Sequence, residues 1–261
     1  MDMKRILRFA GYFLKSRHRR GHGIHSPFVF DLVNRILRSN IPGGVKKIIS
    51  DRRKEMSLRN DKIIVDDLGA GSGFTSSVER RISDISRRSS IRSRYGRILF
   101  NLASLYNGKN ILELGTAVGI STQYIAMGAP ESRVISIEGS ENLAKIAGEN
   151  LMRSGLKNVD IVTGSFDEKL ENVLKMHIPS MIFIDGNHRK GPVLEYFNKL
   201  KELIDPDSVI ILDDINYSEE MAEAWNEIKS DPQVSVSIDI FQMGFVFFRE
   251  GIVKQEFIIK Y

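Results

Sequence analysis

Four side chains that could do acid–base or metal chemistry follow short apolar runs in the second half of the chain. Asp185 and His188 come after MIFI, and Asp213 and Asp214 come after VIIL. If both runs are parallel strands of one sheet, their carboxyl ends open onto the same crevice and the three carboxylates converge there. Converging carboxylates repel one another unless a cation neutralises them, and Mg²⁺ prefers oxygen ligands. The pattern therefore predicts a divalent metal site formed by Asp185, Asp213 and Asp214.

The same residues predict proton transfer. A metal-bound hydroxyl group has a lowered pKa, and His188, with an ordinary pKa of about 6.5, could accept its proton. We therefore expect catalytic roles for Asp185 and His188. Three other interpretations stay open: the pair Asp213–Asp214 caps a helix that begins near Ser218 or holds its loop by hydrogen bonds, Asp185 contacts a cofactor without a metal, or His188 binds an adenine ring.

Two stretches of the chain resemble each other as ligand-binding turns. IIVDDLGAGSGFTSS spans residues 63–77, and NILELGTAVGISTQYIA spans residues 110–126. Each joins a short apolar run, an acidic residue and a glycine-containing turn that leads into a helix-like stretch. Only the second, which includes Glu113, is followed by another strand-like run that ends in an acid, Glu138. An acid there can accept both ribose hydroxyls of an adenosine, so the second stretch is predicted to bind the ligand.

The spacing of the second turn narrows the ligand. Its glycines are Gly115 and Gly119, whereas dinucleotide sites use the closer G-x-G-x-x-G spacing to bring the backbone against a pyrophosphate. The missing middle glycine disfavours NAD and FAD and favours an adenosine ligand without phosphate. For the first stretch two interpretations remain: a lid over the substrate side of the crevice, with Gly69, Gly71 and Gly73 allowing its motion, or a surface hairpin.

The strands and helices that must position these residues are expected from residue 109 onward. Apolar strand-like runs alternate with amphipathic helix-like stretches, which predicts βαβ units and a buried parallel sheet. Residues 234–241 alternate between apolar and polar side chains, a turn follows at 242–244, and a second apolar run ends at 248. This pattern predicts a hairpin with an antiparallel last strand. The expected strands are 110–114, 133–137, 159–163, 181–184 and 208–212, and the expected helices 140–153, 192–204 and 218–230.

The first hundred residues differ in composition from the rest. They hold 23 Lys and Arg against 9 Asp and Glu, whereas the whole chain of 261 residues has a net charge of +5. Such a basic half can attract nucleic acid, acidic lipid or an anionic substrate, or it can neutralise the acidic half of its own chain or of a second subunit. Helices are expected at 4–15 and 28–38, and either an exposed helix or a mobile segment at 82–97.

Overall composition excludes several classes of protein. Hydrophobic residues make up 42% of the chain, enough for a packed core. The absence of cysteine excludes disulfides and thiolate metal sites and fits a reducing cytoplasm. Apolar runs all stay short of the roughly 20 residues that span a bilayer, and the basic N-terminus lacks a small-residue cleavage site. We therefore expect a cytoplasmic protein without a transmembrane segment.

With these motifs in order, the chain resembles the class I S-adenosylmethionine-dependent methyltransferases from about residue 95 to 261. ILELGTAVG is similar to their first motif and VISIEGS to their acidic second motif. FIDGNH and VIILDDIN resemble the metal-dependent small-molecule O-methyltransferases, of the catechol type and relatives acting on sugars and antibiotics. The resemblance implies a doubly wound, Rossmann-like, seven-stranded sheet with an antiparallel last strand.

The resemblance also implies roles for individual residues. Those expected to bind S-adenosylmethionine are Glu113, Gly115, Thr116, Gly119, Ser121, Glu138, Ser165, Phe166 and Asp185. Asp185, Asp213 and Asp214 match the metal ligands of the subgroup. The catechol type has asparagine where Asp214 stands and lysine where His188 stands, which leaves the catalytic base and the acceptor open.

The sequence thus predicts an enzyme with two parts. Residues 95–261 would be the S-adenosylmethionine-binding methyltransferase domain, and residues 1–94 a basic, mainly helical extension on the substrate side or at a homodimer contact. The expected reaction is O-methylation of a small-molecule hydroxyl group assisted by a divalent cation such as Mg²⁺. The alternatives are a metal-independent methyltransferase acting on RNA or protein through the basic half, and a non-catalytic cofactor-binding protein.

Overall fold

The computed structural model describes residues 3–16, 24–67 and 76–261. The chain divides into two compact units, which we describe separately. The middle unit is Asn34–His177, and the terminal unit combines Met1–Val33 with Ile178–Tyr261. Within the described residues, none of the helices is both long enough and apolar enough to cross a membrane.

The middle unit contains a parallel three-stranded arrangement. β3 (Ile111–Leu114), β4 (Val134–Glu138) and β5 (Val159–Thr163) lie in the order β3-β4-β5. The side chains of β3 and β4 are buried throughout, as expected of strands covered on both faces. The crossover helices are α6 (Ile120–Gly128) and α7 (Glu141–Arg153), and α8 (Phe166–Met176) follows β5.

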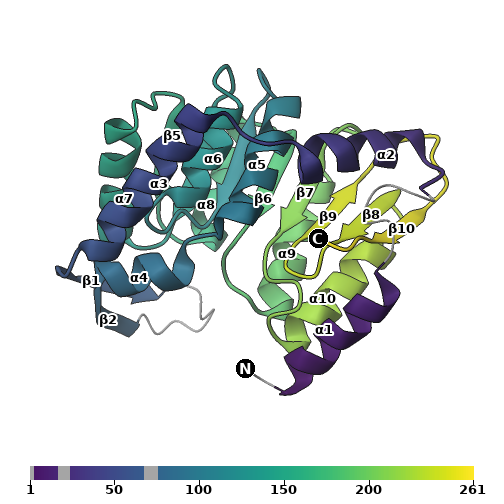
Figure 1. The fold of residues 1–261 in the computed structure, drawn as a ribbon, viewed down its shortest axis with the longest axis horizontal. Helices are drawn as coiled ribbons and strands as arrows, with labels where there is room; N and C mark the ends of the chain where they lie inside the picture. Colours follow the sequence, from purple (N-terminus) through teal and green to yellow (C-terminus); the bar gives the residue numbers. More distant parts are fainter. Residues whose placement is uncertain (1–2, 17–23, 68–75) are drawn as a thin grey trace. The chain divides into compact units, whose positions relative to one another are not determined.

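Further helices and a hairpin precede β3 in the same unit (Figure 1). The predicted helix 28–38 becomes α2 (Pro27–Val33), which belongs to the terminal unit, followed by the π-helical turn η1 (Asn34–Arg38) at the start of the middle unit; α3 spans Gly43–Leu58. The segment predicted as an exposed helix or a mobile stretch forms α4 (Ile82–Ser89) and the largely buried α5 (Ser93–Leu105). α5 packs against α6 because Gly96 leaves room for the ring of Tyr124, where a Cβ atom would stand 2.2 Å from the ring.

The first glycine-rich stretch is flanked by a hairpin. β1 (Lys62–Asp67) and β2 (Ser76–Arg81) pair antiparallel, with Val65 opposite Val78. This pairing agrees with the hairpin interpretation of residues 63–77. The glycines at 69, 71 and 73, to which the lid hypothesis refers, lie outside the described residues.

The terminal unit contributes five strands in the order β10-β8-β9-β7-β6. β6 (Met181–Ile184) and β7 (Val209–Leu212) are parallel and are joined through α9 (Lys190–Lys201). α10 (Glu219–Ser230) leads from β7 to the hairpin of β8 (Val236–Asp239) and β9 (Gly244–Phe247), and β9 is antiparallel to both β7 and β8. The predicted hairpin and antiparallel strand are confirmed.

The expected number of strands was wrong by one. The described residues give the main sheet eight strands, three in the middle unit and five in the terminal unit. The additional strand is β10 (Gln255–Ile258), which runs parallel to β8. None of its four residues is fully buried, and it is a short edge strand without the continuous apolar run that marks most of the others.

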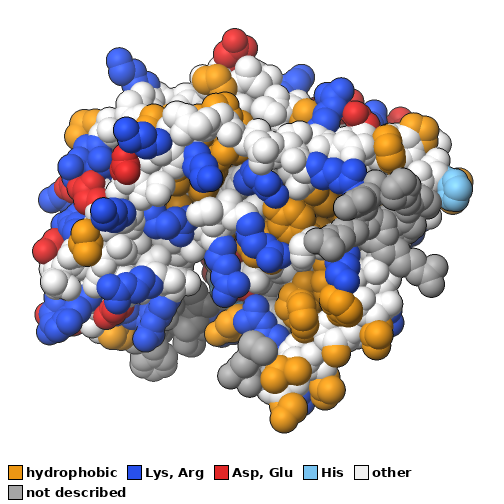
Figure 2. Space-filling view, in the orientation of Figure 1, with side chains coloured by type: hydrophobic (Ala, Val, Ile, Leu, Met, Phe, Trp, Pro, Cys, Tyr) orange, Lys and Arg blue, Asp and Glu red, His pale blue; other side chains and the backbone are white. Residues whose placement is uncertain are grey.

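Helix α1 (Met3–Lys15) packs on the C-terminal part of the same unit. The Tyr12 hydroxyl group donates a hydrogen bond to the backbone carbonyl of Ile259 at 2.5 Å, and Phe9 contacts Phe241 edge to face. Other apolar side chains of the helix stay exposed, Leu7 and Leu14 among them, and Figure 2 shows hydrophobic side chains on the surface in the region of this helix. The predicted helix therefore packs into the core through one of its faces only.

Candidate functional site

The glycine turn between β3 and α6 has the backbone conformation that its sequence predicts. Gly115 and Gly119 have φ angles of 104° and 81°, in the left-handed region that favours glycine. Between them Ala117, at φ 48°, adopts the same region without being glycine. The turn is tied to the sheet by a hydrogen bond from the Gly115 N–H to the Ile137 carbonyl, 3.0 Å long. A helix begins directly after this turn, so its first N–H groups face the end of the strands.

Glu138 stands at the end of β4 as predicted, and the glycine turn holds it. One carboxylate oxygen accepts a hydrogen bond from the Ala117 N–H at 2.7 Å, and the other accepts one from the Ser140 N–H at 3.0 Å. Burial raises the pKa of Glu138, while these and neighbouring backbone N–H groups act in the opposite direction. These neighbouring groups are the N–H groups of Thr116 and Gly139, so the backbone holds the carboxylate from several sides.

Glu113 lies one strand away in a buried network of hydroxyl groups. Its Oε2 atom accepts hydrogen bonds from Thr122 at 2.6 Å and from Ser136 at 2.7 Å. Ser136 also contacts the Thr116 hydroxyl group at 2.6 Å, and Ser121 adds a further hydrogen bond to the carboxylate. Burial raises the pKa of Glu113, which is fully inaccessible to solvent. The other oxygen of this carboxylate is buried without a hydrogen-bond partner among the described residues.

The predicted adenine-side residues follow β5. Gly164, at φ 139°, donates its N–H to the carbonyl of Glu138 at 2.9 Å, which ties the loop after β5 to the end of β4. Ser165 is the N-cap of α8 and accepts a hydrogen bond from the Glu168 N–H. Phe166, partly exposed, is the first residue of that helix. Both residues therefore stand beside the strand that ends in Glu138.

In the terminal unit, Asp213 and Asp214 share one hydrogen-bond donor. The side-chain amide of Gln242, in the β8–β9 turn, donates to Asp214 at 2.5 Å and approaches Asp213 at 3.3 Å. Arg5 of α1 lies 3.8 Å from the Asp214 carboxylate. Asp213 is buried, and its burial together with the charge of Asp214 raises its pKa to about 7. The pair is thus partly neutralised by a proton, an amide and a guanidinium group.

Asp185 and His188 are also neighbours. The His188 Nε2 atom lies 3.9 Å from an Asp185 carboxylate oxygen, and its ring is 5.9 Å from that of Tyr217. Burial lowers the pKa of His188, and the charge of Asp214 opposes this shift. The loop between them contains Asn187 at φ 53°, which lets the chain reverse before α9.

The helix-capping interpretation of the aspartate pair is wrong. Ser218 is the N-cap of α10, and its hydroxyl group accepts a hydrogen bond from the Met221 N–H at 3.1 Å. Asp213 and Asp214 instead face Gln242 and Arg5. In the described part of the chain, however, no three His, Asp or Glu side chains are grouped closely enough to hold a metal ion. The carboxylate oxygens fit a hard divalent cation in chemistry, and the full three-ligand set stays a prediction.

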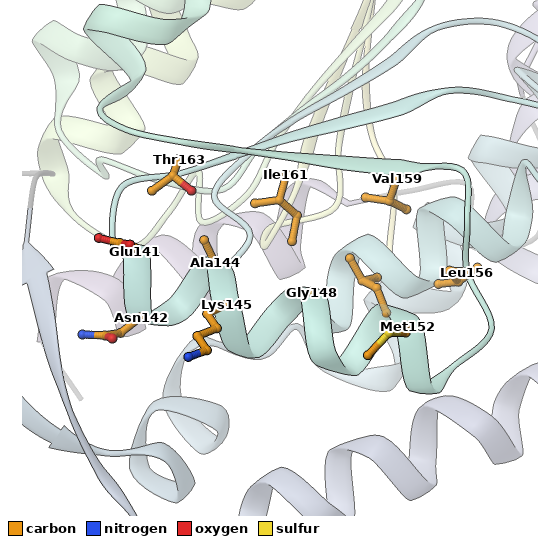
Figure 3. Close-up of a pocket in the computed structure, with 11 residues that line it drawn as sticks. Glu141, Asn142, Ala144, Lys145, Gly148, Met152, Leu156, Val159, Ile161 and Thr163 are labelled. Atoms are coloured by element: carbon orange, nitrogen blue, oxygen red, sulfur yellow. The ribbon is translucent and has the colours of Figure 1, made fainter.

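Two cavities border the middle unit's strands and helices. One, of about 580 Å³, lies between α7 and β5, where Val159, Ile161 and Thr163 line up along one face of the strand (Figure 3). None of the predicted ligand-binding residues lines it. The other, of about 560 Å³, lies between the β1–β2 hairpin and α4 and includes Ala117 of the glycine turn.

Several contributors to the site were not predicted. Ala117 provides an N–H to Glu138, and Ser136 and Thr122 hold Glu113. A signal for Ser136 exists in the sequence, because it is a polar residue inside the apolar run VISI, whereas Thr122 stands between the polar residues Ser121 and Gln123. Gln242 gave no such signal, since it was interpreted only as a turn residue. Its role depends on the β8–β9 hairpin meeting the end of β7.

Comparison with known proteins identifies this part of the chain. A family profile described as a methyltransferase domain matches residues 112–215, which include the glycine turn, Glu138 and the aspartate pair. Residues 112–215 are therefore similar to a methyltransferase domain. The catechol O-methyltransferase of Niastella koreensis is 36% identical to it over 130 residues, or 48% of this chain. That of Mycobacterium tuberculosis is 28% identical over 130 residues, or 49% of this chain.

The chain spans 58% of the length of both of these curated relatives. Among solved structures, an O-methyltransferase from Bacillus cereus in complex with SAH superposes with a TM-score of 0.54 at 22% identity, covering 84% of this chain and 97% of that one. At this identity the likeness establishes the fold. The chain thus has the Rossmann-like architecture expected from the sequence, with one more strand.

Proposed function

We propose that this chain is an S-adenosylmethionine-dependent methyltransferase that transfers a methyl group to a hydroxyl group of a small molecule. The observation that carries the proposal is the environment of Glu138. Its carboxylate ends β4 and is oriented by backbone N–H groups of the glycine turn and of the start of α7, and the two ribose hydroxyl groups of the cofactor would bind there. The names of the curated relatives, both catechol O-methyltransferases, support a small-molecule acceptor.

The cofactor would be held by the glycine turn and by the ends of three neighbouring strands. Gly115 and Thr116 would lie beside its methionine part, Glu138 at its ribose, and Ser165 and Phe166 at its adenine. Gly119 has a left-handed φ angle, and a Cβ atom at this position would stand 3.3 Å from the Cβ atom of Ala147, so glycine suits the turn on both counts. Asp185 stays a cofactor contact implied by the family resemblance.

The reaction is a displacement at the sulfonium methyl carbon. The carbon–sulfur bond breaks as a carbon–oxygen bond forms, and the acceptor hydroxyl group loses its proton. His188 would accept that proton, because burial lowers its pKa and favours the neutral imidazole. A divalent cation bound by Asp185, Asp213 and Asp214 would lower the pKa of the acceptor hydroxyl group.

A substitution at Glu138 tests the cofactor part of this proposal. Glu138→Gln keeps the shape of the side chain but removes its charge and one acceptor, so the affinity for S-adenosylmethionine should fall by about 1.5–3 kcal/mol, or roughly 10- to 100-fold in Kd. Isothermal titration calorimetry measures this directly. Glu141→Gln, three residues later on the exposed side of α7, is the matched control and should bind as the wild type does. Unchanged affinity in Glu138→Gln would remove the basis of the assignment.

One observation favours a second candidate function. The described residues contain no three-ligand metal group, and the first hundred residues are strongly basic. Both features suit a metal-independent methyltransferase that acts on RNA or protein. The two candidates differ in a simple assay, in which EDTA stops methylation of a small-molecule acceptor and Mg²⁺ restores it. Activity that persists in EDTA and depends on salt-sensitive RNA binding would support the second candidate. Homodimerisation and a cytoplasmic location remain predictions.

A further inference from the structure

The 560 Å³ pocket beside the glycine turn contains unusual charges. Its walls come from the β1–β2 hairpin, from α4, from Ala117 and from Leu143 at the start of α7. The Asn142 side chain joins two of these walls, α7 and β1, because it donates a hydrogen bond to the Ile64 carbonyl at 2.9 Å. A volume of this size accommodates a small molecule.

The acidic side chains of this pocket are already paired, whereas three arginines are not. Glu79 lies 2.7 Å from Lys62, and Asp84 lies 4.0 Å from Arg87 of the same helix. The remaining cations, Arg80, Arg81 and Arg88, form no ion pair with a carboxylate in the described part of the chain. Figure 2 shows Lys and Arg side chains gathered over this part of the middle unit. The pocket thus carries an uncompensated positive charge.

The type of cation and the neighbouring groups indicate the ligand. Guanidinium groups bind phosphate and carboxylate through paired hydrogen bonds. No aromatic side chain is found among the described residues that line the pocket, so it lacks the stacking platform typical of sites for single-stranded nucleic acid. Ala117 connects the pocket to the cofactor site, because its N–H group holds Glu138. An anion bound here would adjoin the turn that is expected to carry the methyl donor.

We propose that Arg80, Arg81 and Arg88 form a site for a phosphate or carboxylate group of a small molecule bound at the glycine turn. Two molecules could supply this group: the methyl acceptor, which would then be an anionic hydroxyl compound, or S-adenosylmethionine itself through its methionine carboxylate. The inference deepens the proposed methyltransferase function and depends on it for the identity of the ligand. The anion site itself can be tested without methyl transfer.

Pyrophosphate is a suitable probe for the arginines. Calorimetric titration of the full chain should show binding that weakens as salt is added, and the double variant Arg81→Gln/Arg88→Gln should bind pyrophosphate at least tenfold more weakly. The matched control is Lys109→Gln/Lys157→Gln, which removes the same charge at exposed positions outside the pocket. Equal weakening in both double variants, or no pyrophosphate binding by the wild-type protein, would overturn the proposal. Circular dichroism and urea unfolding of each variant show that the comparison is between folded proteins.

Titration with S-adenosylhomocysteine distinguishes the two sources of the anion. If the arginine variant keeps its affinity for S-adenosylhomocysteine while losing pyrophosphate, the site serves the acceptor. If both affinities fall tenfold and pyrophosphate competes with S-adenosylhomocysteine, the site serves the cofactor carboxylate. A single-stranded RNA that binds through these arginines while pyrophosphate does not would contradict a small-molecule site. Failure of the methyltransferase assignment is seen separately, as unchanged cofactor affinity in Glu138→Gln.

Discussion

Two buried glutamates on adjacent strands, Glu113 and Glu138, differ in what surrounds them. Glu138 is oriented by backbone N–H groups of the turn and of the start of α7, which keeps its position independent of neighbouring side chains. Glu113 instead depends on the hydroxyl groups of Ser136 and Thr122 and has an oxygen without a partner among the described residues. The first arrangement suits ligand binding, and the second makes the protein sensitive to proton uptake.

Glu113 should make the stability of the protein fall as pH rises. Burial raises its pKa in the folded protein above the ordinary value of 4.5, so the folded state keeps a proton that the unfolded chain releases. The stabilisation is complete below pH 4.5 and is lost as the pH rises through the folded-state pKa. Each unit of upward shift corresponds to about 1.4 kcal/mol.

Urea unfolding at pH 5 and pH 8 measures this effect. Glu113→Gln, which cannot ionise, should lose less stability between these pH values than the wild-type protein does. If the free energy of unfolding of the wild-type protein and of the variant changed equally between these pH values, Glu113 would be charged in the folded state at both of them.

At the residue scale, the sequence predicted side chains whose role depends on being at the end of a strand. Glu138 was predicted from the order strand, turn, helix and acid-tipped strand, and the structure places it against the turn. Gln242 was not predicted, because it comes to the aspartate pair from a distant hairpin. Local patterns contain no information about such a tertiary contact. The same reason explains why Arg5 was not connected with Asp214.

At the scale of elements, the turn between β3 and α6 should be intolerant of side chains. Gly119→Ala places a Cβ atom in the left-handed region, which costs about 1–2 kcal/mol, and brings it to 3.3 Å from the Cβ atom of Ala147. We expect Gly119→Ala to lower the free energy of unfolding by more than that amount and to weaken S-adenosylmethionine binding.

Gly155 offers a matched control for Gly119. Its φ angle is 75°, close to that of Gly119, but no atom lies within 4 Å of a Cβ atom built there. Gly155→Ala should therefore show only the conformational cost. Urea unfolding compares the two variants, and equal losses of stability would mean that the contact with α7 contributes nothing.

The elements of the α/β sheet were predictable where hydrophobicity is continuous. β5 and β6 have the predicted bounds, and the other predicted strands differ by a residue or two. β10 was missed because its residues are only half-buried and mixed in polarity. Residues 82–97 were ambiguous because arginines and serines mask the apolar residues that α4 and α5 bury, such as Ile82, Ile85 and Leu99. Periodicity predicts an element only when its buried face is wide enough to dominate the sequence.

At the scale of the whole molecule, Mg²⁺ should stabilise the protein if the proposed metal site exists. A cation that binds only the folded state adds RT ln(1 + [L]/Kd), which is about 2.7 kcal/mol at a concentration of 100 Kd. The melting temperature of the wild-type protein should therefore rise with Mg²⁺ concentration. In Asp213→Asn/Asp214→Asn the rise should disappear.

Differential scanning calorimetry provides this measurement. Asp205→Asn, which removes an exposed carboxylate of the same unit, is the control and should keep the response. A double variant that responds to Mg²⁺ as strongly as the wild-type protein would place cation binding elsewhere. Because the readout is a stability, it does not depend on knowing the acceptor.

The hydrogen bond from Tyr12 to the carbonyl of Ile259 ties the first helix to the last residues of the chain. Tyr12 also accepts a hydrogen bond from the Tyr261 N–H at 3.2 Å, and the helix that it anchors carries Arg5 to the Asp214 carboxylate. Trimming the last three residues would therefore loosen the first helix and withdraw a positive charge from the acidic pair. A protein shortened in this way should bind cations differently, although none of the deleted atoms touches the carboxylates.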